Sequence, residues 1–200
     1  MNKIITIGRE FGSGGREFGR RLAEELGIEY YDKEIIDAIA EKTSMSEEYV
    51  QEVLEGKPHH LFPITIAQSL LISDNYYMLQ EQSIYLAQSE IIRELAQKSS
   101  CVIVGRCADF ILKDLKPYRI FVYADLDSRI ARCIARNTNS EKNLTEKEIK
   151  KQILSIDKNR AKYYDYYTGN KWGDKNNYDL CINTTGVVIK EIVPVIARMF

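Results

Sequence analysis

Short runs of β-branched and aromatic residues alternate along this chain with longer stretches whose apolar residues recur at helical spacing. The first run, at residues 4–7, stops at a glycine, which is typical of a strand buried on both faces of a parallel sheet. Comparable runs predict strands at residues 28–31, 101–104, 119–123 and 180–183.

Helical periodicity fills the intervals between these runs. Phe18, Leu22 and Leu26 recur at helical spacing, and residues 33–99 carry a mainly helical pattern. Strands that alternate with helices indicate an α/β fold, so we predict a doubly wound sheet of five parallel strands with about seven helices on its two faces. The 200 residues suit a single domain over residues 1–200.

A polar segment at residues 137–150 has no apolar stripe and predicts a mobile loop that leads into a helix. Thr145 and Glu148 have the spacing of a capping box at the start of that helix.

Composition and charge narrow the class of protein. The net charge of -1 gives no general attraction to nucleic acid or to an anionic membrane, which favours a small ligand. The absence of a leader or a long apolar run, and four cysteines without a CxxC pair, predict a cytoplasmic protein with reduced thiols. Whether the protein forms a homo-oligomer is left open by the sequence, because the apolar stretch at residues 61–72 suits either a core helix or a dimer face.

A glycine-rich loop, residues 8–19, joins the first strand to the first helix. Its glycines let main-chain N–H groups converge, and the positive end of the helix dipole adds to their field, so the loop predicts a phosphate site. Arg16, Arg20 and Arg21 lie just past the glycines at residues 12–15 and can add charge-assisted contacts.

Two other interpretations of this loop are open. A plain turn would also join a strand to a helix, but Gly12, Gly14 and Gly15 are more than a tight turn needs. A dinucleotide site would require an acidic residue about 20 residues beyond the loop at the end of the second strand, and Asp32 comes too early for it.

Four separated segments resemble the cytidylate kinase-like family of P-loop nucleoside monophosphate kinases. They are residues 12–17 of the loop, the strand ends 31–33 and 104–106, and residues 157–160. The resemblance implies a P-loop fold with an acceptor-binding helical region at residues 33–99 and a lid at residues 137–150. It also implies transfer of the γ-phosphoryl group of ATP to a nucleoside monophosphate, with Mg²⁺ as cofactor.

By position, the resemblance implies roles for individual residues. The residues that would hold the donor phosphates are Gly12, Ser13, Gly14, Gly15, Arg16 and Glu17. The residues that would bind the acceptor are Asp32, Lys33, Arg106, Asp157 and Arg160. The residues that would act in catalysis are Arg16, Arg132 and Arg136. A surface ion pair between Asp157 and Arg160 is the alternative for that pair.

Arg129, Arg132 and Arg136 resemble the arginines that lead into the lid of these kinases. They are three and then four residues apart, so they share one helical face, which a solvated basic stripe would also explain. Asp127 or Ser128 is expected to cap their helix.

The loop departs from the P-loop pattern, which ends in Gly-Lys-Ser/Thr. The lysine is absent, and we expect Arg16 to supply its charge, although a planar guanidinium differs from a compact ammonium. The hydroxyl that would ligate magnesium is also absent from its place, so Glu17 and Asp32 are the magnesium candidates, with Ser13 as a further one.

The acceptor side departs from the family as well. In cytidylate kinases an aspartate follows the arginine of the third strand end, whereas Cys107 follows Arg106 here and Asp109 is a candidate substitute. Three functions therefore stay open: a nucleoside monophosphate kinase, a kinase of a small non-nucleotide acceptor, and a protein that binds nucleotide without transferring phosphate. The tyrosines of residues 163–167 are expected to pack in the core or against a subunit rather than to bind nucleic acid.

Overall fold

The computed structural model describes residues 2–54, 70–137 and 144–200. Most of the apolar stretch at residues 61–72, most of the polar segment predicted as a lid, and residues 55–69 of the predicted acceptor region lie outside these ranges.

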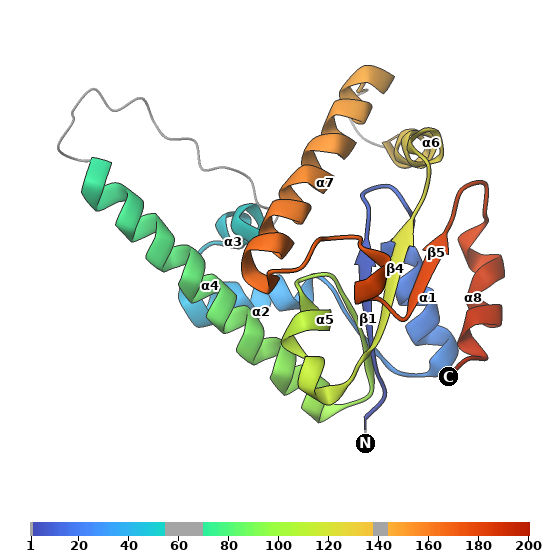
Figure 1. The fold of residues 1–200 in the computed structure, drawn as a ribbon, viewed down its shortest axis with the longest axis horizontal. Helices are drawn as coiled ribbons and strands as arrows, with labels where there is room; N and C mark the ends of the chain where they lie inside the picture. The colour runs from blue at the N-terminus through green and yellow to red at the C-terminus, as the bar shows by residue number, and fades with distance from the viewer. Residues whose placement is uncertain (1, 55–69, 138–143) are drawn as a thin grey trace.

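A parallel sheet of five strands forms the centre of the molecule (Figure 1). The strands are β1 (Ile4–Arg9), β2 (Glu29–Tyr31), β3 (Cys101–Val104), β4 (Tyr118–Tyr123) and β5 (Leu180–Asn183). They lie in the order β2-β3-β1-β4-β5, and every neighbouring pair is parallel. All five predicted strands are confirmed. Their carboxyl ends share one edge of the sheet, where open α/β folds bind ligands.

Eight α-helices and two short 3₁₀-helices surround the sheet in the described ranges. The α-helices are α1 (Gly15–Leu26), α2 (Glu34–Thr43), α3 (Glu47–Leu54), α4 (Leu70–Lys98), α5 (Ala108–Ile111), α6 (Leu126–Asn137), α7 (Glu146–Thr168) and α8 (Ile189–Ala197). The 3₁₀-helices are η1 (Lys113–Leu115) and η2 (Lys175–Asn177). None of the helices in the described ranges combines the length and apolar character needed to cross a membrane.

Helices cover both faces of the sheet, as the alternating pattern predicted (Figure 1). Phe18 and Leu22 of α1 and Val193 of α8 pack in one buried cluster with Ile5 and Ile7 of β1. A second cluster joins the opposite face of the sheet to α2, α4 and α5. The first strand is therefore buried on both sides, which explains its uninterrupted β-branched sequence.

Helices α6 and α7 stand beyond the carboxyl ends of the strands (Figure 1). A small apolar cluster of Ile130, Ile149 and Ile153 joins these two helices. The predicted capping box is confirmed, because the Thr145 hydroxyl accepts a hydrogen bond from the Glu148 amide and the Glu148 carboxylate accepts one from the Thr145 amide.

The predicted cap of α6 is wrong. The helix begins at Leu126, one residue before Asp127, so neither Asp127 nor Ser128 precedes it. The Asp125 carboxylate accepts a hydrogen bond of 2.7 Å from the Ser128 amide, which is the contact of an N-terminal cap.

Candidate functional site

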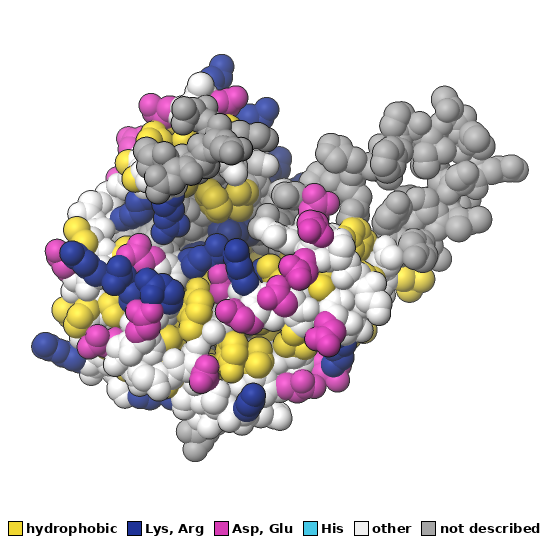
Figure 2. Space-filling view, turned by 180° about the vertical axis from the view of Figure 1, so that it is seen from behind, with side chains coloured by type: hydrophobic (Ala, Val, Ile, Leu, Met, Phe, Trp, Pro, Cys, Tyr) yellow, Lys and Arg dark blue, Asp and Glu magenta, His cyan; other side chains and the backbone are white. Residues whose placement is uncertain are grey.

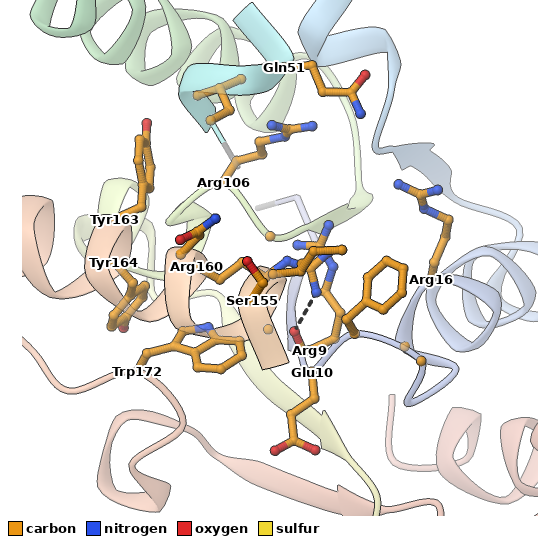
Figure 3. Close-up of a pocket in the computed structure, with 18 of the residues that line it drawn as sticks. Arg9, Glu10, Arg16, Gln51, Arg106, Ser155, Arg160, Tyr163, Tyr164 and Trp172 are labelled. Atoms are coloured by element: carbon orange, nitrogen blue, oxygen red, sulfur yellow. Dashed lines mark hydrogen bonds between the residues drawn. The ribbon is translucent and has the colours of Figure 1, made fainter. Parts of the chain in front are cut away.

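A cleft of about 1290 Å³ opens at the carboxyl ends of the strands. The glycine-rich loop forms one wall, the turn after β3 another, and α7 a third (Figure 3). The cleft brings together the predicted site residues Gly12, Gly14, Gly15, Arg16, Lys33, Arg106, Arg136 and Arg160. These residues come from five separate segments of the chain and meet in one hollow.

Two glycines of the loop have backbone conformations that other residues adopt with strain. Gly12 has φ 78° and Gly14 has φ 84°, both in the left-handed region. A Cβ on Gly12 would lie 2.9 Å from the main-chain oxygen of Arg129, and one on Gly14 would lie 2.9 Å from Ile189. Close packing and backbone shape both require glycine at these two positions.

The loop leaves several of its amides without an acceptor. The Glu10 amide donates to the Val122 carbonyl, and the Phe11 amide donates to the Asp157 carboxylate. By contrast, no described residue accepts a hydrogen bond from the amides of Gly12, Gly14, Arg16 or Glu17. These groups lie at or just before the amino end of α1, where the helix dipole is positive, so they form a ready anion site.

The side chains of Thr184 and Arg132 hold the loop in this conformation through hydrogen bonds to the Ser13 carbonyl. Ser13 is fully buried, and its carbonyl accepts hydrogen bonds from Thr184 Oγ1 at 2.7 Å and from Arg132 Nη1 at 3.4 Å. Arg132 also donates to the carbonyls of Thr184 and Val187. The guanidinium of Arg132 therefore ties the loop to the segment between β5 and α8.

The other two arginines of α6 have different surroundings. Arg129 is only 7% exposed, which excludes a solvated stripe, and its guanidinium pairs with Asp157 and lies 3.6 Å from Glu10. Arg136 is half exposed, lines the cleft and lies 3.7 Å from Glu17. Of the three, Arg136 is the one whose charge faces the open cleft.

Asp157 and Arg160 are more than a surface pair. The Asp157 side chain is 13% exposed and lies beneath the loop, where it accepts hydrogen bonds from the Phe11 amide at 2.7 Å and from Arg129. Arg160 donates to the Arg9 carbonyl at 3.3 Å and lines the cleft. The predicted Asp157–Arg160 contact exists at 4.0 Å, but Asp157 does not line the cleft and Arg160 does.

Arg9 is a cleft residue to which sequence reasoning gave no role. It ends β1, and its pKa is lowered to about 9, chiefly by burial and then by the charge of Arg160, while Asp32 has the opposite effect. The only hint in the sequence was a charged residue at the end of an otherwise apolar strand.

Asp32 connects two arginines of the site. Its Oδ2 lies 2.6 Å from Arg16 Nε, and its Oδ1 lies 3.8 Å from Arg9 Nη2. Oδ1 is buried and accepts no hydrogen bond from a described residue, and Arg9 is the charged neighbour with which it forms an ion pair.

The carboxylates fit a magnesium ion unequally. Glu17 is paired with Arg21 at 2.8 Å, and the described part of the chain contains no group of three potential metal ligands. Mg²⁺ beside phosphates needs only one or two carboxylates, since phosphate oxygens and water complete its shell. Asp32 Oδ1, which accepts no hydrogen bond from a described residue, meets that requirement better than Glu17 does, although Asp32 lines a smaller hollow beside α1 and not the cleft.

A second, smaller hollow lies beside α1. It is lined by Arg16, Glu17, Arg20, Arg21, Tyr30, Asp32, Lys33, Glu34 and Arg136. Figure 2 shows Lys and Arg side chains gathered on this face of the molecule, with acidic side chains between them. Arg20 and Arg21 pair with Glu24 and Glu17 of their own helix, so they are less available to the loop than Arg16.

The turn after β3 has an uncommon backbone. Gly105, Arg106 and Cys107 have φ values of 75°, 62° and 53°, three left-handed residues in a row. Non-glycine residues in this region are strained and are held by their surroundings, often at functional sites. Here the Arg106 carbonyl accepts from Gln88 Nε2 at 3.0 Å, and Arg106 lines the cleft.

Asp109, the candidate substitute on the acceptor side, is committed to another contact. Its Oδ2 accepts a hydrogen bond of 2.6 Å from the Tyr164 hydroxyl. Burial raises the pKa of Asp109, which that bond partly offsets. Tyr164 and Trp172 continue the same wall of the cleft (Figure 3).

Comparison with known proteins gives the family. The sequence model of the cytidylate kinase-like family matches residues 4–186. The chain belongs to this family. Cytidylate kinase-like relatives include the cytidylate kinase of Methanopyrus kandleri, which is 26% identical over 195 residues, 92% of this chain and 86% of that protein.

Solved structures extend the likeness to the fold. An uncharacterized protein from Eubacterium ventriosum has a TM-score of 0.70 and 30% identity, with 99% of this chain and 98% of that chain covered. The shikimate kinase of Bacteroides thetaiotaomicron has a TM-score of 0.56 and 14% identity over 98% of this chain and 96% of its own. The predicted fold, a doubly wound sheet of the P-loop kinase type, is confirmed.

Proposed function

We propose that the protein transfers the γ-phosphoryl group of ATP to a nucleoside monophosphate. The observation that carries this proposal is the set of amides without acceptors at Gly12, Gly14, Arg16 and Glu17, beside a cleft that also holds Arg106. Converging amides at a helix terminus select phosphate, and arginines across the same cleft suit a second phosphate group.

The donor phosphates would lie on the loop from Gly12 to Glu17. Buried Ser13 fixes the loop through its carbonyl, and Arg16, which contacts Asp32 at 2.6 Å, would turn from that carboxylate to a phosphate oxygen. A preformed loop reduces the reorganisation that phosphate binding requires.

The acceptor would lie between Arg106, Arg160 and Lys33, all of which line the cleft. Asp157 would act on the acceptor through Arg160 and the loop, because its carboxylate is hydrogen-bonded beneath the loop. Asp32 and Glu17 would serve the donor side with Mg²⁺, which neutralises charge on the phosphate oxygens when it is bound.

Two arginines of α6 would act together at the lid. Arg136 faces the cleft and would turn from Glu17 to the phosphates as the lid closes. Arg132 would support catalysis by keeping the loop attached to Thr184 and Val187.

In the reaction, an oxygen of the acceptor phosphate forms a bond to the γ-phosphorus as the bond from that phosphorus to the β–γ bridging oxygen breaks. ADP leaves with the electron pair, and the acceptor becomes a diphosphate. Because the nucleophile is already an anion, no general base is needed, and the protein contributes alignment and charge neutralisation.

A coupled assay of ADP formation, with ATP, Mg²⁺ and a panel of nucleoside monophosphates, tests the proposal. We expect turnover with at least one monophosphate and only slow hydrolysis without acceptor. Binding of ATP with no turnover for any acceptor would identify a nucleotide-binding protein instead. Turnover only with small non-nucleotide acceptors would agree with the hydrogen bond between Asp109 and Tyr164.

All four cysteines are free, as is usual for proteins of the cytoplasm, and we propose that the protein acts there.

A further inference from the structure

The loop lacks the P-loop lysine, and the motif ending Gly-Lys-Ser/Thr can be aligned with it in two registers. If Gly15 is the glycine of the motif, Arg16 takes the place of the lysine, as expected above. If Gly14 is that glycine, the lysine is replaced by Gly15, which has no side chain. In the second register the charge must come from another part of the chain.

Arg9 occupies the space that a side chain at position 15 would fill. A Cβ on Gly15 would lie 2.5 Å from Arg9 Cβ and 3.1 Å from Arg9 Cγ. The other end of Arg9 reaches the turn after β3, where a Cβ on Gly105 would overlap Arg9 Nη1. Because Gly15 and Gly105 have no side chains, the Arg9 side chain fits between them and extends from the loop to the turn after β3, the acceptor wall.

The charge of Arg9 is poorly balanced within the protein. Arg160, Arg106 and Arg16 all act on Arg9 as like charges, and of the described side chains that shift its pKa only Asp32 attracts it. Asp32 is 3.8 Å away, beyond hydrogen-bond range, and has a shorter contact with Arg16. Burying a cation without close pairing is unfavourable, and a bound polyphosphate would remove that imbalance.

Arg9 and Arg16 differ in their readiness for this role. The Arg9 side chain is 13% exposed and its channel is fixed by packing, whereas the Arg16 side chain is 53% exposed and held by Asp32. Figure 3 shows Arg9 in the middle of the cavity and Arg16 at its side. A preorganised cation stabilises developing charge better than one that must first leave another partner.

We infer that Arg9 is the residue that binds the transferring phosphoryl group in place of the P-loop lysine. This inference rests on the proposed function for its catalytic part, but it also predicts binding of inorganic polyphosphate, which needs no acceptor and no turnover. The expected ligand is a chain of at least two phosphates, because the Arg9 guanidinium lies between the loop amides and the turn after β3 that forms the acceptor wall.

Calorimetric titration with tripolyphosphate tests the binding part, using the whole chain as wild type, Arg9→Met, Arg9→Gln and Arg9→Lys. Losing one charge-assisted contact should weaken binding about 30-fold in the Met and Gln variants, and Arg9→Lys should bind more tightly than both. Arg119→Met is the matched control: Arg119 pairs with Asp179 outside the cleft, so its loss should leave the affinity within about twofold of wild type.

The coupled assay tests the catalytic part with the same variants. Removing Arg9 should lower kcat about 100-fold, while Arg9→Met melts no lower than wild type because a poorly paired buried cation has been removed. A purely structural role would lower the melting temperature and leave the affinity for tripolyphosphate unchanged.

The two proposals can fail separately. The inference is overturned if the Met and Gln variants bind tripolyphosphate within about threefold of wild type, if all three Arg9 variants bind equally, or if wild type does not bind it. If wild type transfers no phosphate but Arg9→Met still loses tripolyphosphate, the proposed function fails and the role of Arg9 as the phosphate-binding cation stands.

Discussion

The proposed donor and acceptor sides of the cleft are built by different means. On the donor side the main chain supplies the binding groups, and Ser13, Thr184 and Arg132 hold it in place. On the acceptor side long side chains, among them Arg106 and Tyr164, form the wall. Main-chain amides bind any phosphate, whereas side chains discriminate between ligands. The contrast suggests a general donor site and a selective acceptor site.

The largest effect is expected from Gly12→Val on the donor side. The substitution places a side chain 2.9 Å from the Arg129 carbonyl at a φ of 78°. The loop backbone must therefore shift, and its N–H groups no longer point toward one anion. We expect ATP affinity to fall more than about 100-fold and the free energy of unfolding to fall by about 1–3 kcal/mol. Calorimetry and urea unfolding measure the two quantities.

Gly169→Ala is the matched control for that variant. Gly169 has a φ of 69° but no atom within 4 Å of an added Cβ, so an alanine there strains a left-handed backbone position, less than a valine would, without disturbing the loop. Equal ATP affinity in Gly12→Val and Gly169→Ala would contradict a main-chain donor site.

The next effect is expected from Arg16→Ala and Arg136→Ala. Both side chains are about half exposed. Arg16 contacts Asp32, which also lies near Arg9, and Arg136 contacts Glu17, which is itself partly exposed to solvent. Their loss should therefore lower turnover about 100-fold with little change in melting temperature. Steady-state kinetics and thermal melts check this, and full activity in both variants would mean that neither arginine is catalytic.

A smaller and more selective effect is expected from Arg106→Ala. Because Arg106 belongs to the acceptor wall, the KM for the acceptor should rise about 30-fold while the dissociation constant for ATP stays within about twofold. The comparison of the two sides fails if this variant weakens ATP and acceptor binding equally.

The smallest effect concerns pH and Asp109. Burial raises the pKa of Asp109 above its usual 3.8, so the folded protein holds a proton there that the unfolded chain releases. This contribution to stability is present below pH 3.8 and is lost as the pH rises through the raised pKa. Asp109→Asn keeps an acceptor for Tyr164, and its stability relative to wild type should increase between pH 4 and pH 7 in urea unfolding. A constant difference would contradict a buried, proton-holding carboxyl group.

Much of the fold could be predicted from local pattern. The central strands β1, β3 and β4 contain short buried runs, so their hydrophobic sequence alone marks them. The capping box at Thr145 and Glu148 is encoded within four residues. The start of α6 could not be predicted as well, because Asp125, Asp127 and Ser128 are all acceptable caps and packing decides among them.

The site was harder to predict because its contacts join distant segments. The loop glycines carry a local signal, but the position of Asp157 beneath the Phe11 amide depends on how α7 packs over the loop. Arg9 is visible in the sequence, yet its direction depends on Gly15 and Gly105 together. Gly15 and Gly105 are far apart in the sequence, so their spacing does not show that both lie beside Arg9 in the fold.

The account depends on the free amides of the loop as an anion site. A crystal structure with a non-hydrolysable ATP analogue tests this directly. We predict β- and γ-phosphate oxygens within about 3 Å of the amides of Gly12, Gly14 and Arg16, with the loop unchanged. An analogue bound elsewhere, or a loop whose amides bond to the protein instead, would contradict the account.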